Sequence, residues 1–327
     1  MNDLAQVIFS SKLQEEFDKN CLTIFHHQAV HCEIYRRYIS HLGIEPNDIT
    51  EVSKIPYLPI SFFKTHKILS NSNHPQLTFT SSGTTGMAQS KHFVTDQKLY
   101  DASFLTAFNI FYGSVRDYCI LALLPSYQER DGSSLIYMVD ALIEETDHPD
   151  SGYFLYNHSD LFDKLERLKS DNQKTILIGV TYALLDFIEQ YSISFPELII
   201  METGGMKGKR KEMVREELHQ ILTTGFGVSS IHSEYGMTEL LSQAYSTGEG
   251  IFNCPPWMMI KLRDTNDPLS LISGQKTGGI NVIDLANLNS CSFIATQDLG
   301  KLYPDNSFEV LGRFDNSDIR GCNLLVQ

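Results

Sequence analysis

Several features that would assign this chain to a particular class of protein are missing from its sequence. No apolar run reaches the roughly 18 residues that a membrane-spanning helix needs. The N-terminal stretch has no basic segment followed by an apolar one, so we expect no secretory signal peptide. The six cysteines are scattered rather than closely spaced, which disfavours a disulfide framework and indicates a reducing, cytoplasmic setting.

Positive charge is scarce as well. The 327 residues include 26 Lys and Arg against 40 Asp and Glu, a net charge of -14. This balance argues against nucleic acid as a main partner, while a basic protein partner stays compatible with it. Hydrophobic residues make up 42% of the chain, so a sizeable core is expected. Composition says nothing about the oligomeric state.

The residue pattern, and with it the expected secondary structure, changes along the chain. Residues 1–75 have apolar positions at helical spacing, a stop at Gly43 and then a proline-punctuated connector. Residues 76–250 alternate strands (118–125, 175–180, 197–202) with helices (160–170 with Ser159 as a candidate cap, 182–190, 207–222). Residues 251–312 are rich in short strands. We therefore expect an α/β core over 1–312, with mainly parallel sheets flanked by helices and a β-rich C-terminal part, and a short arm at 313–327.

A loop rich in hydroxyl groups lies within residues 77–92, LTFTSSGTTGMAQSKH. It is not a Walker A loop, because Met87 follows Gly86 where that motif needs Lys and then Ser or Thr. Glycine N–H groups and hydroxyls suit phosphate oxygens, although a plain surface loop explains the stretch equally well on its own. The candidate phosphate-binding residues are Ser81, Ser82, Gly83, Thr84, Thr85 and Gly86.

Three later segments carry groups that suit the rest of a nucleotide. In SEYGMTEL (233–240) the Thr238 hydroxyl stands beside the Glu239 carboxylate, and Mg²⁺ readily takes one carboxylate plus phosphate oxygens. Tyr235 in the same segment could stack on a base. Asp298 in ATQDLG and Arg313 in VLGRFDN follow, each of which alone would be a surface charge.

Together and in this order, the four segments resemble the adenylate-forming (ANL) superfamily. Its Y-G-x-T-E is matched by Tyr235, Gly236, Thr238 and Glu239, and its G-R-x-D by Gly312, Arg313 and Asp315. Its [ST]-G-D is matched by Thr296-Gln297-Asp298 with Gln for Gly, and Lys91 stands at a displaced position of its loop lysine. The resemblance implies that Thr238 contacts the α-phosphate of ATP, Glu239 holds Mg²⁺, and Asp298 and Arg313 bind the ribose. A glycine pair that lines adenine in this superfamily points to Gly204 and Gly205, with Met206 next.

A closer resemblance covers nearly the whole chain. The stretches PYLPISFFK (56–64), LALLPSYQERDGSSLIYMV (121–139) and LGRFDNSDIRGCNLLV (311–326) are similar to LuxE-type acyl-protein synthetases. The resemblance implies activation of a fatty acid as acyl-AMP, transfer to a cysteine near the C-terminus and delivery to an acyl-protein reductase. Cys322 is the matching cysteine, and Arg320 could lower its pKa. Since 14 residues follow Arg313, we expect the usual mobile C-terminal domain of the superfamily to be missing.

Other residues have both a functional and a purely structural interpretation. His232, three residues before Tyr235, could face the carboxylate of the acid or sit as an ordinary rim histidine. His27 and His31 are four apart on one helical face, a spacing that can hold zinc but also suits a polar helix surface. Lys207 could meet phosphates. The candidates for the acyl pocket, which core packing also explains, are Tyr127, Leu135, Tyr137 and Met138.

The sequence thus favours an enzyme that uses ATP and Mg²⁺ to activate an apolar carboxylic acid and passes the acyl group to a protein thiol. Two alternatives stay open: an acyl- or aryl-CoA ligase, and a non-catalytic subunit that binds an acyl group or nucleotide. Acid-dependent exchange of pyrophosphate into ATP distinguishes an enzyme from a binder, and dependence on CoA distinguishes the two enzymes.

Overall fold

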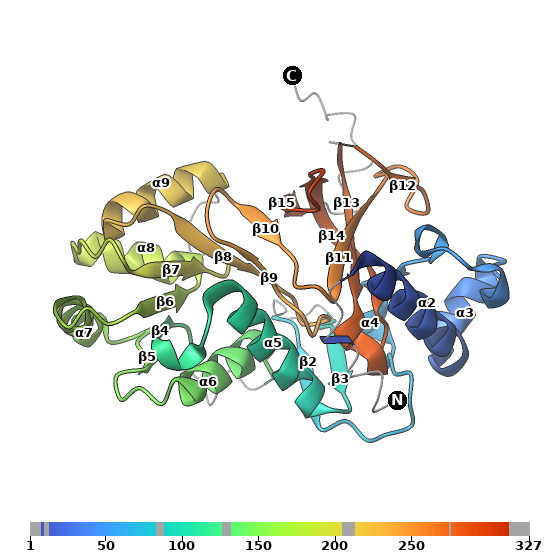
Figure 1. Ribbon diagram of the computed structural model, residues 1–327, viewed down its shortest axis with the longest axis horizontal. Helices are drawn as coiled ribbons and strands as arrows, with labels where there is room; N and C mark the ends of the chain where they lie inside the picture. The colour runs from blue at the N-terminus through green and yellow to red at the C-terminus, as the bar shows by residue number, and fades with distance from the viewer. Residues whose placement is uncertain are drawn as a thin grey trace.

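A single large sheet runs through the molecule in the computed structural model, which describes residues 8–9, 13–82, 88–125, 132–204, 213–274 and 276–313 (Figure 1). The sheet has the order β12-β11-β13-β14-β15-β10-β9-β8-β7-β6-β4-β5, with β1 paired to β14, and β2 and β3 form a separate hairpin. The strands are β1 (Leu58–Pro59), β2 (Leu77–Thr80), β3 (Lys91–Val94), β4 (Cys119–Leu123), β5 (Gly152–Tyr153), β6 (Thr175–Gly179), β7 (Ile199–Glu202), β8 (Ile231–Tyr235), β9 (Ala244–Ser246), β10 (Ile251–Asn253), β11 (Met258–Arg263), β12 (Leu271–Ile272), β13 (Thr277–Asp284), β14 (Phe293–Leu302) and β15 (Phe308–Arg313).

The described residues form α-helices and short 3₁₀ turns. The α-helices are α2 (Gln14–His31), α3 (Glu33–His41), α4 (Phe62–Thr65), α5 (Gln97–Tyr112), α6 (Ser134–Thr146), α7 (His158–Ser170), α8 (Thr181–Gln190) and α9 (Arg215–Phe226). Short 3₁₀ turns lie at Pro46–Asp48, Val52–Lys54, Val115–Asp117 and Leu285–Asn289. Among the described helices, none is both long enough and apolar enough to cross a lipid bilayer.

Strands β5, β4, β6, β7 and β8 pair in parallel and form one half of the sheet. All five residues of β4 and of β6 are buried, as expected for parallel strands covered on both faces. Leu121, Leu177 and Ile200 pack with residues of α7, α8 and α9 on one face, whereas Ile120, Ile176 and Met201 pack with residues of α5 and α6 on the other. The alternating strands and helices expected between residues 76 and 250 are therefore confirmed.

From β8 onwards the pairing within the sheet changes from parallel to antiparallel. Strands β9 to β15 form this half, with α2 and α3 beside it in Figure 1. The buried amide of Gln28 in α2 fastens the helix by donating to the carbonyl oxygens of Asn287 (3.0 Å) and Leu288 (3.1 Å). The β-rich texture expected from residue 251 is present, and the halves meet at the β8–β9 hairpin.

Two details of the expected helices are wrong. α9 begins at Arg215, with Glu216 and Glu217 in its first turn, and not at residue 207. This start agrees better with the helix dipole, which favours acidic side chains at an N-terminus. α7 is capped by Asn157, whose side chain accepts from the N–H of Asp160 (3.4 Å), and not by Ser159.

Candidate active site at the parallel-to-antiparallel junction

A cavity of about 330 Å³ opens where the parallel strands end. Its walls come from the segments after β2, β4, β6, β7 and β8 and from the start of α6, which is where ligands bind in open α/β sheets. The lining residues are Thr80, Ser82, Tyr100, Pro125, Ser133, Ser134, Leu135, Met138, Val180, Tyr182, Thr203, Gly204, Glu234, Gly236, Met237, Thr238 and Gln243. Ser82, Gly204, Gly236 and Thr238, which the sequence pointed to from three separate segments, thus meet in one cavity.

The base of the hydroxyl-rich loop is tied together by serines. The N–H of Ser81 donates to the carbonyl oxygen of Ser90 (3.1 Å), and the N–H of Ser90 donates to the Ser81 hydroxyl (2.9 Å). These two bonds close the loop beside the antiparallel pair of β2 and β3, so that Ser82 lies at the cavity wall. The predicted phosphate ligands at 83–86 lie outside the described residues.

Glu239 lies next to this loop rather than in the cavity wall. Its side chain is 6% exposed, its carboxyl group hydrogen-bonds to Ser90, and its carbonyl oxygen accepts from Nδ2 of Asn287 (2.8 Å). Burial raises the pKa of Glu239, and the Ser90 hydrogen bond and the charges of Arg313 and Lys64 only partly offset that effect. The residue named for Mg²⁺ therefore adjoins the loop named for phosphate.

The turn that carries Thr238 and Glu239 is held from two sides. The His92 ring lies with Nδ1 3.0 Å from the Thr238 carbonyl oxygen and Nε2 3.0 Å from the Ser290 hydroxyl. Burial lowers the pKa of His92 to about 4, so the ring is neutral and Nδ1–H is the donor to the carbonyl. Asp284 accepts from the N–H groups of Leu241 (2.8 Å) and Ser242 (3.0 Å). Neither His92 nor Asp284 stands out in the sequence.

Three predicted nucleotide-binding residues touch one another across the two halves of the sheet. The Tyr235 hydroxyl donates to Oδ2 of Asp298 (2.9 Å), and Nε of Arg313 lies 3.3 Å from Oδ1 of the same carboxylate. Burial raises the pKa of Asp298, while the hydroxyl and the guanidinium partly offset the rise. The Arg313 side chain is 69% exposed, which leaves its remaining donors open to a ligand.

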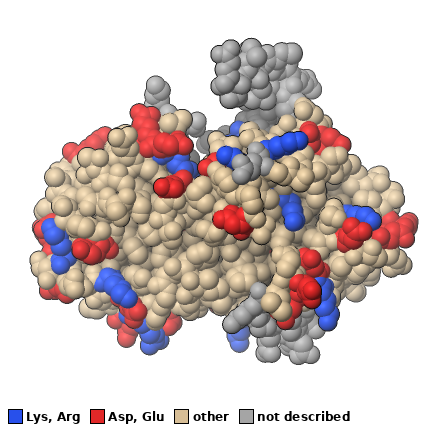
Figure 2. Space-filling view, turned by 45° about the horizontal axis from the view of Figure 1, so that its top comes forward, with Lys and Arg blue, Asp and Glu red and all other residues tan. Residues whose placement is uncertain are grey.

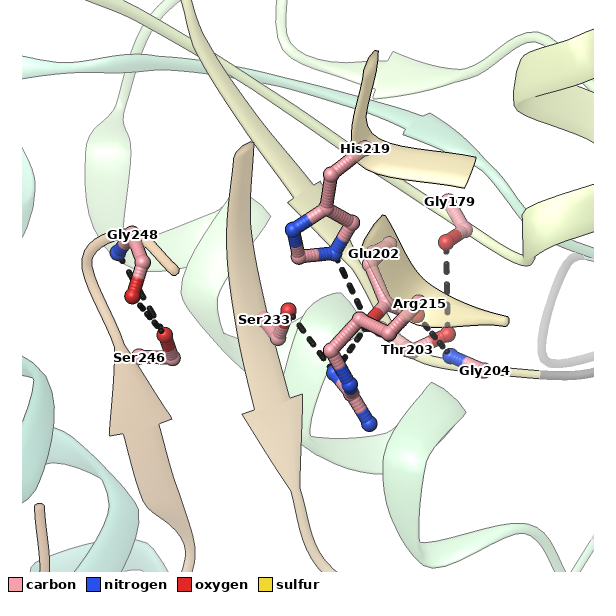
Figure 3. Close-up of polar contacts among 9 residues, drawn as sticks. All are labelled: Gly179, Glu202, Thr203, Gly204, Arg215, His219, Ser233, Ser246 and Gly248. Atoms are coloured by element: carbon pink, nitrogen blue, oxygen red, sulfur yellow. Dashed lines mark hydrogen bonds and ion pairs between the residues drawn. The ribbon is translucent and has the colours of Figure 1, made fainter. Parts of the chain in front are cut away.

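The Gly204 turn at the end of β7 rests on a buried carboxylate (Figure 3). Glu202 accepts from the N–H of Gly204 (2.7 Å) and from Nη1 of Arg215 (2.9 Å), and Nε2 of His219 lies 3.7 Å away, beyond hydrogen-bond distance. Burial alone would raise the pKa of Glu202, but these neighbours outweigh it and lower the pKa. Gly204 has φ +71°, a conformation that glycine adopts without strain. Gly205, Met206 and Lys207 lie outside the described residues.

Two other predicted site residues do not line the cavity, and a third cannot be placed relative to it because it is outside the described residues. Lys91 is exposed on β3, opposite Thr80 in the hairpin, and does not line the cavity. His232 does not line it either, and its Nδ1 lies 3.2 Å from the Tyr112 hydroxyl. Cys322 lies outside the described residues. Catalytic roles for Lys91, His232 and Cys322 therefore stay predictions.

Among the polar lining residues that the sequence reasoning missed are Glu234 and Gln243. Both line the cavity, Glu234 from the end of β8 and Gln243 from the residue before β9. Burial, together with the charge of Glu202, raises the pKa of Glu234 to about 8. Strand alternation could have revealed Glu234, because residues two apart share a face and Glu234 lies two before Gly236. Gln243 carried no such signal, since it reaches the cavity only through the hairpin.

The other expectations from the sequence have mixed outcomes. Leu135 and Met138 line the cavity, whereas the Tyr137 hydroxyl donates to Asp101 (2.8 Å) and Tyr127 lies outside the described residues. Within the described part of the chain no group of three or more His, Cys, Asp or Glu could hold a metal ion, so the zinc alternative has no support there. His27 and His31 instead pack ring against ring, 4.5 Å between centroids.

The surface charges are mixed in sign on the face shown in Figure 2. There the described Lys and Arg side chains are scattered among Asp and Glu and do not form a stripe. A continuous basic track is what binding along a nucleic-acid backbone requires. Such a track is not present among the described residues of this face.

The fold is shared with adenylate-forming ligases of known structure. A 2-hydroxyisobutyryl-CoA ligase, solved with 2-HIB-AMP and CoA, superimposes with a TM-score of 0.70 at 12% identity, covering 93% of this chain and 76% of that one. The ATP-bound MatB of Rhodopseudomonas palustris gives a TM-score of 0.54 at 16% identity, covering 72% of this chain and 47% of that one. At such low identity these similarities establish the fold, and they confirm the α/β architecture expected from the sequence.

Sequence comparison identifies relatives of this chain more specifically than the shared fold does. A segment of 76 residues, 23% of this chain, is 42% identical to a long-chain-fatty-acid–luciferin-component ligase of Photorhabdus luminescens. This chain spans 65% of the length of that relative. The family described as "Acyl-protein synthetase, LuxE" matches residues 5–327. The match extends over almost the whole chain and confirms the resemblance seen in its motifs, so the chain belongs to the LuxE acyl-protein synthetase family.

Proposed function

We propose that this protein activates a carboxylic acid with ATP. A carboxylate oxygen of the acid attacks the α-phosphorus of ATP, a P–O bond forms, and the bond to the bridging oxygen breaks to release pyrophosphate. The product is acyl-AMP, a mixed anhydride. Reactions of this kind depend mainly on positioning and on neutralising charge, which suits a cavity lined by hydroxyl-bearing residues such as Ser82 and Thr238.

The observation that carries this proposal is the convergence of separate segments on one place. Ser82, Gly204 and Thr238 line one cavity, and Glu239 lies beside the loop that contains Ser82. Tyr235, at the end of β8 just before Thr238 and Glu239, contacts Asp298, and Arg313 contacts the same carboxylate. In the proposal the loop 81–86 binds the β- and γ-phosphates, Thr238 the α-phosphate, and Asp298 and Arg313 the ribose.

The residues also fit a magnesium ion that arrives with ATP. Mg²⁺ needs few protein ligands when phosphate oxygens supply the rest, so a single carboxylate, that of Glu239, is sufficient. The raised pKa of Glu239 fits this role, because a cation would stabilise the ionised form of a buried acid that lacks a close countercharge. When bound, Mg²⁺ would neutralise charge on the phosphates.

In a second step the acyl group would move to a protein thiol. The thiolate sulfur attacks the acyl carbon, a C–S bond forms, and the C–O bond to phosphate breaks to release AMP. We propose Cys322 as this nucleophile, and a second protein, such as a reductase, as the final acceptor. The five cysteines of the described residues fit the role poorly, because burial raises the pKa of each thiol; they are Cys21, Cys32, Cys119, Cys254 and Cys291.

Exchange of labelled pyrophosphate into ATP tests the first step. The assay should depend on an added fatty acid, and Glu239→Gln should lower the rate by about 100-fold or more, because it removes the charge while conserving side-chain shape. Glu33→Gln is the matched control, since Glu33 is an exposed glutamate on α3 whose side chain is 70% exposed. Acid-dependent exchange that survives Glu239→Gln would contradict the role of Glu239, and no exchange with any acid would contradict adenylation.

Trapping of labelled acyl-protein tests the second step. Cys322→Ser should abolish label that hydroxylamine releases, while Cys254→Ser, a change at a half-buried cysteine elsewhere, should retain it. Full labelling of Cys322→Ser would remove that residue from the proposal. Label that forms only on added CoA would instead favour the CoA ligase alternative.

A further inference from the structure

One wall of the cavity carries polar side chains that have no role in the activation of a plain fatty acid by ATP. Glu234 lies in β8, Gly236 directly follows that strand and Gln243 directly precedes β9, with Tyr235 opposite Ala244 in the hairpin. This register places Glu234, Gly236 and Gln243 on one face. A Cβ at position 236 would collide with Oε1 of Glu234 and lie 3.3 Å from Cγ of Gln243. The two polar side chains therefore converge on the space that glycine leaves.

The amide oxygen of Gln243 lacks a partner there. The residue is 4% exposed, and its Oε1 is buried without a hydrogen bond among the described residues. Leaving a buried polar atom unpaired costs about 1–3 kcal/mol, so native proteins seldom do so without a reason. Since Gln243 lines the cavity, a ligand group in the cavity is in a position to supply the missing hydrogen bond.

Nearby side chains do not satisfy Glu234 either. No described residue hydrogen-bonds to its carboxyl group, although three tyrosines and Glu202 lie close enough to interact electrostatically. The Tyr100 hydroxyl donates to the Ser134 carbonyl oxygen (3.0 Å), and the Tyr245 hydroxyl points to the Met138 sulfur (4.0 Å). Arg215 is paired with Glu202 and so does not neutralise Glu234.

We propose that Glu234 and Gln243 form a hydroxyl-binding subsite, so that the acid which this protein activates is a hydroxylated aliphatic acid. The proposal rests on the function proposed above and names its substrate class. The hydroxyl lies near the carboxyl end of the acid, because the subsite adjoins Gly236 and Thr238. Leu135 and Met138 line the same cavity and suit the aliphatic part.

A hydroxyl group matches this pair better than other small polar groups. It donates and accepts at once, so it satisfies the amide of Gln243 in either orientation and pairs with the carboxyl of Glu234 as donor or acceptor. An ammonium group would need Glu234 to be ionised, although no described residue donates a hydrogen bond to its carboxylate. A second carboxylate would be repelled by Glu202 on the adjacent strand and would meet no described cation in the cavity lining.

The test compares acids of one chain length in the pyrophosphate exchange assay: octanoate, 2-hydroxyoctanoate, 3-hydroxyoctanoate, 8-hydroxyoctanoate and 2-aminooctanoate. For the wild type, kcat/KM should be at least about 10-fold higher with the 2- or 3-hydroxy acid than with octanoate, because the plain acid leaves buried polar groups unpaired. In Gln243→Leu, a change that conserves volume, this ratio should fall to near one. Gln190→Leu, at an exposed position that ends α8, should keep the wild-type ratio.

Each outcome supports or overturns the subsite. A hydroxyl preference that Gln243→Leu abolishes and Glu234→Gln weakens less supports it, because an amide at 234 still donates and accepts. Equal use of octanoate and all hydroxy acids would overturn it while leaving adenylation intact, and so would a preference that Gln243→Leu retains. A preference for 2-aminooctanoate would replace it with an ammonium site. Absence of exchange with every acid would overturn the function proposed above, and the subsite with it.

Discussion

Two glutamates on neighbouring strands, Glu202 and Glu234, meet opposite electrostatic surroundings at the site. Glu202 is buried, but Arg215 and the N–H of Gly204 stabilise its carboxylate, which lowers its pKa. Glu234 has no such donors and its pKa is raised to about 8. Near neutral pH the first is therefore ionised and the second largely protonated, which leaves one negative charge at the strand ends instead of two.

Because Glu234 is protonated in the folded protein, the free energy of unfolding should depend on pH. Because the carboxyl keeps its proton in the folded state up to about pH 8 but loses it in the unfolded state near its ordinary pKa of 4.5, folding becomes less favourable as pH rises between these values. We expect the free energy of unfolding to fall by at most about 1.4 kcal/mol per pH unit from this group. Urea unfolding at pH 5.5, 6.5, 7.5 and 8.5 measures it.

Glu234→Gln should flatten that decline, because an amide does not titrate. The difference between the two proteins isolates Glu234, since Asp284, whose pKa burial raises to about 6, is present in both. Glu202→Gln should have the opposite dependence on pH. It removes the stability that the ionised Glu202 carboxylate provides above pH 4.5 and that the wild type loses in acid. Parallel curves for wild type and Glu234→Gln would show that Glu234 is ionised in the folded protein.

At the scale of elements, the turn between β8 and β9 depends on groups far away in the chain. Asp284, at the end of β13, accepts from the N–H groups of Leu241 and Ser242 and from the Ser242 hydroxyl (2.6 Å). His92 on β3 holds the Thr238 carbonyl. The segment that would contact the α-phosphate is thus positioned by strands from both the hairpin β2–β3 and the antiparallel half.

Asp284→Asn should therefore destabilise the protein. The new amide nitrogen would face N–H donors or leave a hydroxyl unpaired, at a cost of about 1–3 kcal/mol in the free energy of unfolding. The control is Asp267→Asn, because Asp267 also accepts from a backbone N–H (Leu269, 3.2 Å) and a hydroxyl (Ser270, 2.6 Å) but in an exposed turn. Urea unfolding should show a much smaller effect for the control, because the exposed turn lets water replace the lost bonds. Equal effects would mean that burial does not set the strength of these bonds.

Much of this arrangement could be predicted from local patterns. Apolar runs such as 118–125 and 175–180 predicted β4 and β6, because a strand buried on both faces has few other compositions. Ser82 and Thr238 were singled out from polar segments that follow strands, and both line the cavity. Those features depend on neighbours in sequence.

Features that depend on long-range pairing could not be predicted. Gln243 enters the cavity because the hairpin register places it beside Gly236, and Asp284 reaches the turn from 42 residues away. The start of α9 at Arg215 and the cap of α7 at Asn157 were also missed, because several polar residues compete at each helix end. The chemistry of a position was therefore easier to predict than its partners.

At the scale of the whole molecule, one hydrogen bond joins the two halves of the sheet at the site. Tyr235 belongs to the last parallel strand and Asp298 to β14 in the antiparallel half, and the hydroxyl–carboxylate bond between them is buried. Arg313, at the end of β15, contacts the same carboxylate. A nucleotide bound to these residues would hold both halves and resist their separation.

Tyr235→Phe should therefore weaken the stabilisation that ATP gives. Without the hydroxyl the Asp298 carboxylate is buried with fewer donors, and a ten-fold loss of ATP affinity would remove about 1.4 kcal/mol of ATP-dependent stability. Thermal unfolding with and without saturating ATP and Mg²⁺ measures the loss. Tyr303→Phe is the matched control, because the Tyr303 hydroxyl also donates to a carboxylate, Glu309 (2.7 Å), away from the cavity. If ATP stabilises Tyr235→Phe as much as the wild type, the Tyr235–Asp298 contact does not contribute to nucleotide binding.

The β8–β9 hairpin carries most of these side chains within residues 231–246. His232, Glu234 and Gly236 share one face of β8, and Tyr235 points to the other, toward Asp298. A chimaera that exchanges this segment with another family member would move Glu234 and Gln243, the pair proposed to contact the acid, together with Tyr235, which is proposed to contact the nucleotide. If both proposals hold, choice of acid and binding of ATP would be inherited together, and a recombination point inside the turn would separate Gln243 from Glu234 and Tyr235.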